Sequence, residues 1–281
     1  MILYPNAKIN LGLNIVAKRP DGYHDIETVM VATDWRDILE IVPAAGPDMT
    51  LTTYGRPVDC PPEKNLVMKA YRALADTIGG LPPAEIYLEK VIPDGAGLGG
   101  GSADAAFTLL GLNEVFNLGL PEDALAKVAA TVGADCPFFI YNRPALCTGT
   151  GTDLTHGLKI DLADRTVLIA KPRVAAVSTK EAYAGVVPSP APLAVAEAIA
   201  APVENWHRCL HNDFEDSIFP KLPEVKAVND RLYAAGATYA SMSGSGAAVF
   251  GIFDDAKMAH IAAEGLTDCD IHIGKAGNLN V

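Results

Sequence analysis

The chain has 281 residues, 49% of them hydrophobic, and a formal net charge of −12 at pH 7. This length predicts one large domain or two ordinary ones, with ample apolar material for a core. No run of about 18 apolar residues occurs, which argues against a membrane span, and the negative charge argues against a general nucleic-acid binder.

The cysteines and the first residues bear on the cellular setting. Five cysteines are scattered through the chain without a CxxC pair, which favours free thiols in a reducing cytoplasm over a disulfide frame or a zinc site. His207 and His211 have an i,i+4 spacing, but no glutamate follows the first histidine, so the HExxH zinc motif fails. The opening residues MILYPNAKINLGLN lack the regions of a signal peptide. We expect a cytoplasmic protein.

The first half of the chain reads as strands followed by helices. Alternating apolar and polar residues predict strands at 8–16, 26–32, 37–42 and 84–92, with a turn at Asp21-Gly22. Helical spacing predicts helices at 63–80, 102–119 and 121–133, and Pro137 begins a short further helix.

The second half begins with a change of composition near 155–165, where a new strand opens. The Pro/Ala-rich stretch 187–202 predicts a flexible insertion or a short helix with loops. Helices are expected at 222–236 and 254–266, with a glycine turn leading into a strand within 240–253. Together the patterns predict two α+β domains, residues 1–158 and 159–281.

The stretch PDGAGLGGGSADAA, residues 93–106, contains five glycines directly before a helix. So many glycines cost folding entropy, so they need a reason. Bare backbone amides and the positive end of a helix dipole bind anions well, and Ser102 offers a hydroxyl at the helix start. The sequence therefore predicts a phosphate-binding loop.

Two well-known glycine motifs, the P-loop and the dinucleotide-binding fingerprint, do not fit this loop fully. A P-loop needs a lysine, and residues 93–106 contain none. The dinucleotide fingerprint GxGxxG matches at Gly95, Gly97 and Gly100, but the preceding strand alternates, whereas a central parallel strand should be continuously apolar. A glycine turn with a purely structural role remains an alternative interpretation of this loop.

The loop resembles the second motif of the GHMP kinases, and PNAKINLGLNI (5–15) and ASMSGSGAAVFGIF (240–253) resemble the first and third motifs. The resemblance implies an α+β two-domain GHMP kinase fold, with a ribosomal-S5-domain-2-like N-terminal domain and a ferredoxin-like C-terminal domain. It also implies ATP-dependent phosphorylation of a small-molecule alcohol.

Within the family, four further segments resemble the kinases that act on a cytidine diphosphate-linked methylerythritol in non-mevalonate isoprenoid synthesis. They are residues 7–30, KNL at 64–66, GADCPFF at 133–139 and KAGNL at 275–279. The partners implied are this substrate and ATP with Mg²⁺, and we expect a monomer or weak homodimer. A homoserine-type or mevalonate-type kinase and a non-catalytic nucleotide-binding regulator stay open.

The resemblance implies two catalytic residues. Asp135 in GADCPFF would be the base, although an aspartate before a short helix is also a common cap. Lys8 lies in an apolar alternating strand and would stabilise developing charge. Asn10 lies two residues on, on the same face of that strand, and would contact the substrate.

The remaining candidate residues bind ligands. Tyr23 and His24 would form a cytosine pocket, with Thr179 and Tyr183 as a second wall, although such a pair is often only packing. The nucleotide-binding set implied by the resemblance is Asn65, Lys90, Pro93, Gly95, Gly97, Leu98, Gly99, Gly100, Gly101, Ser102, Asp104, Gly244 and Ser245.

One departure from the family pattern concerns the helix start. Ser102-Ala103-Asp104 stands where the family commonly has Ser-Ser-Asn. A carboxylate there would repel a bare triphosphate, so we hypothesise that Asp104 helps to hold Mg²⁺, directly or through water. The sequence indicates no dedicated set of metal-ligating residues.

Overall fold

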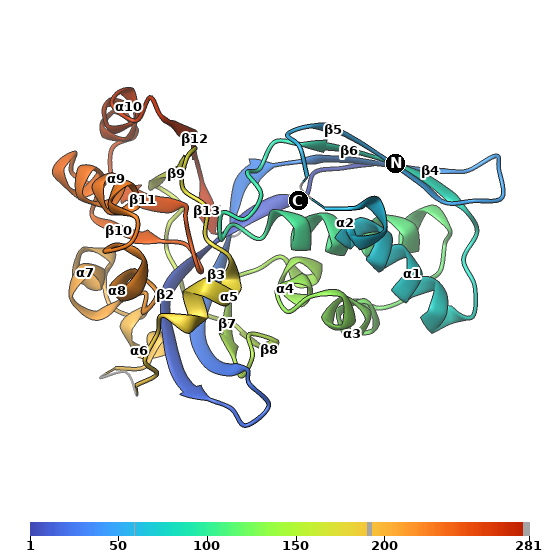
Figure 1. Ribbon diagram of the computed structural model, residues 1–281, viewed down its shortest axis with the longest axis horizontal. Helices are drawn as coiled ribbons and strands as arrows, with labels where there is room; N and C mark the ends of the chain where they lie inside the picture. The colour runs from blue at the N-terminus through green and yellow to red at the C-terminus, as the bar shows by residue number, and fades with distance from the viewer. Residues whose placement is uncertain (59, 190–192, 278–281) are drawn as a thin grey trace. The chain divides into compact units, whose positions relative to one another are not determined.

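The computed structural model describes residues 1–58, 60–189 and 193–277. These residues form two compact units, each assembled from separate stretches of the chain. Unit 1 comprises Met1–Ala7, Trp35–Asp94 and Gly99–Asn142, and unit 2 comprises Lys8–Asp34, Gly95–Leu98 and the residues from Arg143 onward. Figure 1 shows the elements of both units.

Unit 1 contains a four-stranded mixed sheet with the order β1-β4-β6-β5. Its strands are β1 (Ile2–Leu3), β4 (Ile38–Pro43), β5 (Thr50–Gly55) and β6 (Ala84–Lys90). Every second residue of β6 is buried, as the sequence alternation predicted. Strand β6 pairs antiparallel with β4 and parallel with β5, whereas a dinucleotide-binding fold would place parallel neighbours beside this strand.

The helices of unit 1 lie on one face of its sheet (Figure 1). They are the 3₁₀ turn η1 (Pro62–Lys64), α1 (Leu66–Ile78), α2 (Gly100–Val115), α3 (Glu122–Val132) and α4 (Cys136–Tyr141). Helix α2 contacts strand β4 and the helices α1, α3 and α4. Ten of its residues are buried, because small and apolar side chains occupy all of its faces. It is the central helix of the unit.

Unit 2 contains two sheets, and the first holds the long hairpin of β2 and β3. Its strands run in the order β13-β3-β7-β8, with β2 paired to β3. They are β2 (Asn6–Lys18), β3 (His24–Arg36), β7 (Ala145–Thr148), β8 (Asp153–His156) and β13 (Ala276–Gly277). Arg19 N donates to Tyr23 O across the predicted Asp21-Gly22 turn, at 2.8 Å.

The second sheet of unit 2 has the order β10-β11-β9-β12, with every pair antiparallel. Its strands are β9 (Thr166–Pro172), β10 (Tyr239–Met242), β11 (Val249–Phe253) and β12 (Cys269–Gly274). Helix α9 (Pro223–Ala234) precedes β10, and α10 (Ala256–Glu264) precedes β12. A strand–helix–strand–strand–helix–strand path in this order is the ferredoxin-like arrangement.

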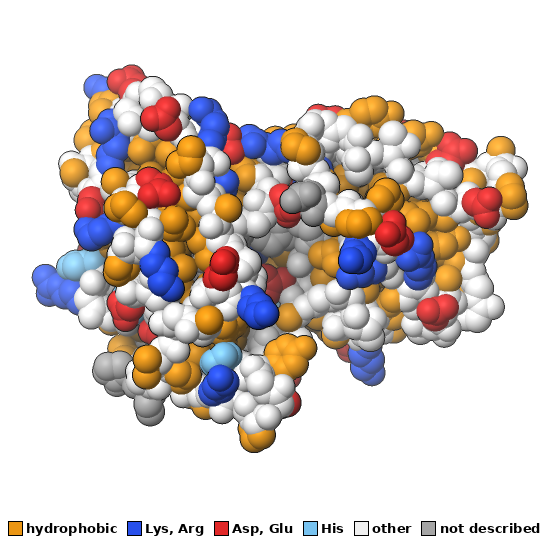
Figure 2. All heavy atoms as spheres, in the orientation of Figure 1, with side chains coloured by type: hydrophobic (Ala, Val, Ile, Leu, Met, Phe, Trp, Pro, Cys, Tyr) orange, Lys and Arg blue, Asp and Glu red, His pale blue; other side chains and the backbone are white. Residues whose placement is uncertain are grey.

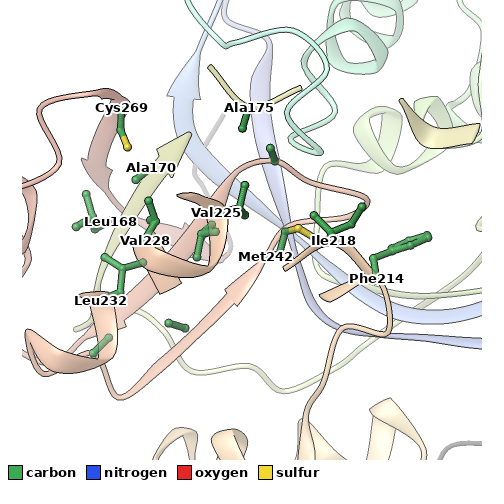
Figure 3. Packing of buried hydrophobic residues seen from close by; sticks show 14 of the residues in the cluster. Leu168, Ala170, Ala175, Phe214, Ile218, Val225, Val228, Leu232, Met242 and Cys269 are labelled. Carbon is green, nitrogen blue, oxygen red and sulfur yellow. The ribbon is translucent and has the colours of Figure 1, made fainter. Parts of the chain in front are cut away.

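Short helices lie between β9 and α9. They are α5 (Thr179–Ala184), α6 (Val195–Ala198), η2 (Val203–Asn205), α7 (Trp206–Cys209) and α8 (Glu215–Ile218). A buried hydrophobic cluster joins residues of α8 and α9 to the second sheet, and it includes Phe214, Ile218, Val228, Leu168 and Met242 (Figure 3). Burying these side chains stabilises the unit by roughly 1.5–3 kcal/mol each.

The structure confirms the long predicted elements, since β2, β3, β4, β6, α1, α2, α3, α9 and α10 all overlap the predicted ranges. Helix α2 begins two residues earlier than predicted, at Gly100. The stretch 187–202 includes α6, although its residues 190–192 lie outside the described chain, as do Asn278 and Leu279 of the KAGNL segment. The boundary at residues 158 and 159 stays a prediction.

Candidate active site

The buried lysine of β2 meets the glycine loop within unit 2. Lys8 Nζ donates to Asn10 Oδ1 at 2.6 Å and to the carbonyl of Gly97 at 3.0 Å. Lys8 and Asn10 are almost fully buried, and they lie on one face of the strand as predicted. Asn10 Nδ2 donates to Thr28 Oγ1 at 3.0 Å, which fixes the orientation of the amide. The carbonyl of Gly97 therefore lies beside a fixed positive charge.

The third glycine motif reaches the same carbonyl. Ser243 Oγ donates to Gly97 O at 2.9 Å. Gly97 has φ of +75°, and a Cβ there would lie 2.0 Å from the carbonyl oxygen of Ser243. Only glycine fits at this position. A Cβ on Gly244 would lie 3.3 Å from Lys8 Nζ, and the half-buried Ser245 follows it. Unit 2 thus brings Lys8, Asn10, Gly97 and Gly244 together.

The start of α2 is suited to anion binding. Gly99 occupies the N-cap position with a left-handed backbone, and no side chain caps the helix. The first amides, on Gly100, Gly101 and Ser102, carry the positive end of a 16-residue helix. Of the other predicted loop residues, Pro93 and Leu98 are buried and Gly95 is exposed.

The turn that carries Asp135 packs against this helix start within unit 1. Asp135 precedes α4, but its side chain makes no capping bond, so its predicted alternative role as a cap is not met. Burial raises the pKa of the thiol of the next residue, Cys136, to about 12, against a smaller opposing effect of Ser102. A Cβ on Gly133 would lie 3.1 Å from Cys136 Sγ and 4.0 Å from Ser102 Oγ. Asp135 therefore lies in a turn whose first residue, Gly133, is close to Ser102.

Lys90 and Asp104 lie in a buried ion cluster with Asp37. Lys90 Nζ donates to Asp37 Oδ2 and, at 2.7 Å, to Asp104 Oδ2. All three residues are at most 5% exposed. Asp37 Oδ1 also accepts from the backbone amides of Val91 and Ile92, at 2.6 and 2.8 Å. The cluster ties the segment before β4 to the end of β6 and to α2.

Burial and the neighbouring charges shift the pKa values within this cluster. Desolvation raises the pKa of Asp104 to about 8, against the opposing effect of Lys90. The nearby carboxylates raise the pKa of Lys90 in spite of its burial. Both side chains therefore have partners in the interior of unit 1. The expected nucleotide contacts of Lys90 and Asp104, and the hypothesis that Asp104 holds Mg²⁺, stay predictions.

Asn65 has a local structural role. Its Oδ1 accepts from Val67 N at 2.9 Å and caps α1, and the residue is 9% exposed. The cap accounts for the start of a helix here. Its predicted nucleotide contact stays a prediction.

Two residues of the predicted cytosine pocket, His24 and Tyr183, meet in unit 2. The rings of His24 and Tyr183 are stacked at 4.8 Å, and Tyr183 packs edge-on against Phe214 at 4.9 Å. Tyr23 is 66% exposed, and Thr179 lies one helical turn before Tyr183 in α5. Burial, with a smaller effect of Lys18, lowers the pKa of His24. The imidazole is therefore neutral near pH 7 and can both donate and accept a hydrogen bond.

Four residues that organise these contacts were not predicted from the sequence. Asp37, Thr28, Ser243 and Asn212 are all fully buried polar side chains. Only Ser243 had a local signal, because it adjoins the Gly244-Ser245-Gly246 turn. The others act through contacts that are distant in sequence, which periodicity does not reveal.

Several wider features complete the description. The five cysteines form no disulfide. In the described part of the chain no group of three His, Cys, Asp or Glu side chains could hold a metal ion, and His211 Nε2 lies 3.1 Å from Asp216 Oδ1. None of the described helices has the length and apolar character needed to cross a membrane. Acidic and basic side chains are interspersed on the visible face of each unit (Figure 2).

An uncapped helix start after a glycine loop, a buried lysine beside a glycine turn and a ferredoxin-like sheet are features expected of a two-domain small-molecule kinase. Comparison with known proteins is more specific. Family models described as the GHMP kinases N terminal domain and GHMP kinases C terminal match residues 65–143 and 195–269. The chain belongs to the GHMP kinase family, and it is an ATP-dependent kinase that acts on an alcohol group.

Two relatives and one protein of similar fold illustrate the similarity. A 4-diphosphocytidyl-2-C-methyl-D-erythritol kinase of Parabacteroides distasonis is 50% identical over 276 residues, which cover 98% of this chain and 99% of that protein. A crystal structure of 4-(cytidine 5'-diphospho)-2C-methyl-D-erythritol kinase has a TM-score of 0.82 and 32% identity, covering 99% of this chain and 100% of that one. A homoserine kinase from Cytophaga hutchinsonii has a TM-score of 0.76 at 18% identity, covering 98% and 94%, and shares the fold alone.

Proposed function

We propose that the chain transfers the γ-phosphoryl group of ATP to the 2-hydroxyl of 4-diphosphocytidyl-2-C-methyl-D-erythritol, a step in non-mevalonate isoprenoid synthesis. The observation that carries this proposal is the 50% identity to a kinase named for that substrate, over 98% of the chain. The stacked His24 and Tyr183 rings support it, since a pyrimidine substrate needs an aromatic surface.

The phosphoryl-transfer chemistry requires a base, charge stabilisation and alignment. Asp135 would accept the proton of the attacking hydroxyl. Lys8 would stabilise the negative charge on the transferring group, and Asn10 would orient the acceptor. The 2.6 Å bond between Lys8 and Asn10 supports a rigid arrangement of these two groups.

The cytidyl group would bind between aromatic residues. Tyr23 and Tyr183 would stack on the base, while His24 and Thr179 would bind its hydrogen-bonding edge. His24 now lies on the face of Tyr183, so we expect its ring to shift when a base stacks there.

The triphosphate would bind to the glycine loop and the first turn of α2, with Gly95, Gly97 and Gly99 to Ser102 closest to it. The fit with Mg²⁺ follows from the donors at the helix start. Ser102 offers a hydroxyl oxygen there, and Mg²⁺ prefers oxygen ligands. Bound there, Mg²⁺ would neutralise phosphate charge. A cytoplasmic location and a monomer or weak homodimer remain predictions.

The proposal is tested by incubating the purified protein with ATP, Mg²⁺ and the cytidyl substrate and following the products by phosphorus NMR. We expect a new phosphomonoester resonance that appears together with ADP. Homoserine and mevalonate in place of the cytidyl substrate should give no phosphoester. Turnover of either alcohol in preference to the cytidyl substrate would favour the alternative kinases, and no ADP release with any alcohol would favour a non-catalytic regulator.

A further inference from the structure

A buried amide holds the third glycine turn of unit 2 from behind. Asn212 is fully buried, and its Nδ2 donates to the carbonyls of Met242 at 2.8 Å and Gly244 at 2.9 Å. Its Oδ1 accepts from the backbone amide of Phe214 at 3.1 Å. Both donor hydrogens and the acceptor oxygen of this amide are therefore used. We call residues 243–246 the third glycine turn.

A carboxylate three residues later binds the same region. Glu215 Oε1 accepts from Ser241 Oγ at 2.6 Å and from Met242 N at 2.7 Å. Asn212 thus supplies donors to backbone carbonyls, while Glu215 supplies an acceptor to a backbone amide. Together the two side chains fix the end of β10 and the beginning of the turn.

The segment that carries Asn212 is itself anchored in unit 2. Leu13 of β2 donates to His211 O at 2.8 Å and accepts from Asp213 N at 2.9 Å. Phe214 and Ile218 pack in the same hydrophobic cluster as Met242 (Figure 3). A side chain held by backbone pairing and by core packing can act as a fixed reference point for the turn.

Hydrogen bonds through the carbonyl of Gly97 connect the turn to Lys8. Ser243, the first residue of the turn, donates to the carbonyl of Gly97 at 2.9 Å, and Lys8 Nζ donates to the same oxygen at 3.0 Å. The backbone of Gly244 also lies close to Lys8 Nζ. Any displacement of the turn would therefore move the Gly97 carbonyl and the ammonium group together.

We propose that Asn212 is a positioning residue for phosphoryl transfer, which holds the third glycine turn so that Ser243 and Gly97 fix the ammonium group of Lys8. This inference rests on the proposed role of Lys8. A misplacement of about 1 Å at a reacting centre can cost about a hundredfold in rate, so a contact outside the reacting atoms can control kcat.

Asn212→Asp is the sharpest test, because the side chains have the same shape. The aspartate keeps the acceptor for Phe214 N, and so keeps the Phe214 and Tyr183 rings in place. It loses both donors and sets a carboxylate oxygen against two carbonyls. We expect kcat to fall by about tenfold to a hundredfold, while KM for the cytidyl substrate stays within about twofold, because base binding is retained.

Asp213→Asn is the matched control in the same segment. Asp213 Oδ2 accepts from Ile15 N at 2.6 Å, and an amide oxygen can accept that bond. We expect kcat of this variant to stay within about twofold of the unsubstituted enzyme.

A double-mutant cycle separates positioning from a general loss of stability. Ser243→Ala removes only the hydroxyl that donates to Gly97, and it should also lower kcat. If both residues act through one contact, the double variant should lose little more than either single variant. Losses that multiply, or a folded Asn212→Asp enzyme with normal kcat and only a lower Tm, would overturn the proposal.

Two further outcomes distinguish a failure of this inference from a failure of the proposed function. Should Asn212→Asp fail to fold, normal kcat in Ser243→Ala would still overturn the inference, and a lowered kcat would support it. Normal turnover in Lys8→Ala would instead contradict the proposed role of Lys8. That result differs from multiplying losses in the double-mutant cycle, which would contradict only the role of Asn212.

Discussion

Two charged side chains carry the proposed chemistry, Asp135 and Lys8. A lost base or a lost charge stabiliser typically costs two to three orders of magnitude in rate. We therefore expect Asp135→Asn and Lys8→Ala each to lower kcat by about a hundredfold or more, measured by ADP release at saturating substrates.

The control for both variants is Asp76→Asn, which changes an exposed carboxylate in α1. It should turn over normally. Near-normal kcat in a folded Asp135→Asn enzyme would exclude Asp135 as the base, whatever the behaviour of Lys8.

The aromatic side of the site gives a second prediction at the residue scale. Removing a ring that stacks on a nucleobase typically costs about 1–3 kcal/mol, so Tyr183→Ala should raise KM for the cytidyl substrate about tenfold. KM for ATP should stay unchanged. Tyr54→Ala, which removes an exposed ring from β5, serves as the control. Equal increases in both KM values would show that Tyr183 does not bind the base specifically.

At this scale the sequence predicted best where residues lie close together in the chain. The pairing of Lys8 with Asn10 follows from the two-residue period of a strand, and the structure has it. The ion cluster of Lys90 and Asp104 was not predicted, because its third member, Asp37, lies 53 residues before Lys90. No local pattern indicates such a partner.

The glycine loop is the element whose shape matters most. A Cβ on Gly97 would clash with the carbonyl of Ser243 and would also strain a left-handed backbone. We expect Gly97→Ala to lower kcat by about a hundredfold, because the carbonyl that accepts from Lys8 must move. Steady-state kinetics of the folded variant test this.

Gly119 provides a matched control for backbone strain. It also has a left-handed φ, of +66°, but no atom lies within 4 Å of a Cβ built on it. Gly119→Ala should lower the free energy of unfolding by about 1–2 kcal/mol without changing kcat. If both alanine variants lose the same activity, strain rather than the contact with Ser243 explains the effect.

Among the elements, those with a clear apolar face were predictable, and the others were not. Helix α1 and strand β6 each present one buried face, which the periodicity revealed. Strand β5 was missed, because its residues TLTTYG are almost all exposed and show no alternation. It forms by pairing with β6, so the signal for it lies outside its own sequence.

On the scale of the whole molecule, the sequence predicted two α+β domains as two successive stretches of chain. The compact units are each assembled from several stretches of chain, since unit 2 includes the β2–β3 hairpin and residues Gly95–Leu98. Contacts between strands far apart in sequence create this arrangement, and β13 pairs with β3 in the same way. Composition changes along the chain cannot show such pairing.

The buried ion cluster gives a prediction for the stability of the whole protein. The cluster links three segments of unit 1, and burial raises the pKa of Asp104 from 3.8 to about 8. Between these values the folded protein retains a proton that the unfolded chain has lost. The folded state then binds more protons, so the contribution of Asp104 to stability falls as pH rises from about 4 to about 8, and it levels off above that range.

Asp104→Asn should remove this dependence, because an amide does not titrate. The amide oxygen of the asparagine side chain can accept a hydrogen bond from Lys90. We expect the variant to gain stability relative to the unsubstituted protein between pH 5 and 8, with a slope of at most about 1.4 kcal/mol per pH unit. Urea unfolding across this range measures the difference, with Asp76→Asn as the control. Parallel stability curves for the two proteins would show that Asp104 is ionised in the fold. The same substitution also tests the hypothesis that Asp104 holds Mg²⁺, because an unchanged Mg²⁺ dependence of kcat would contradict it.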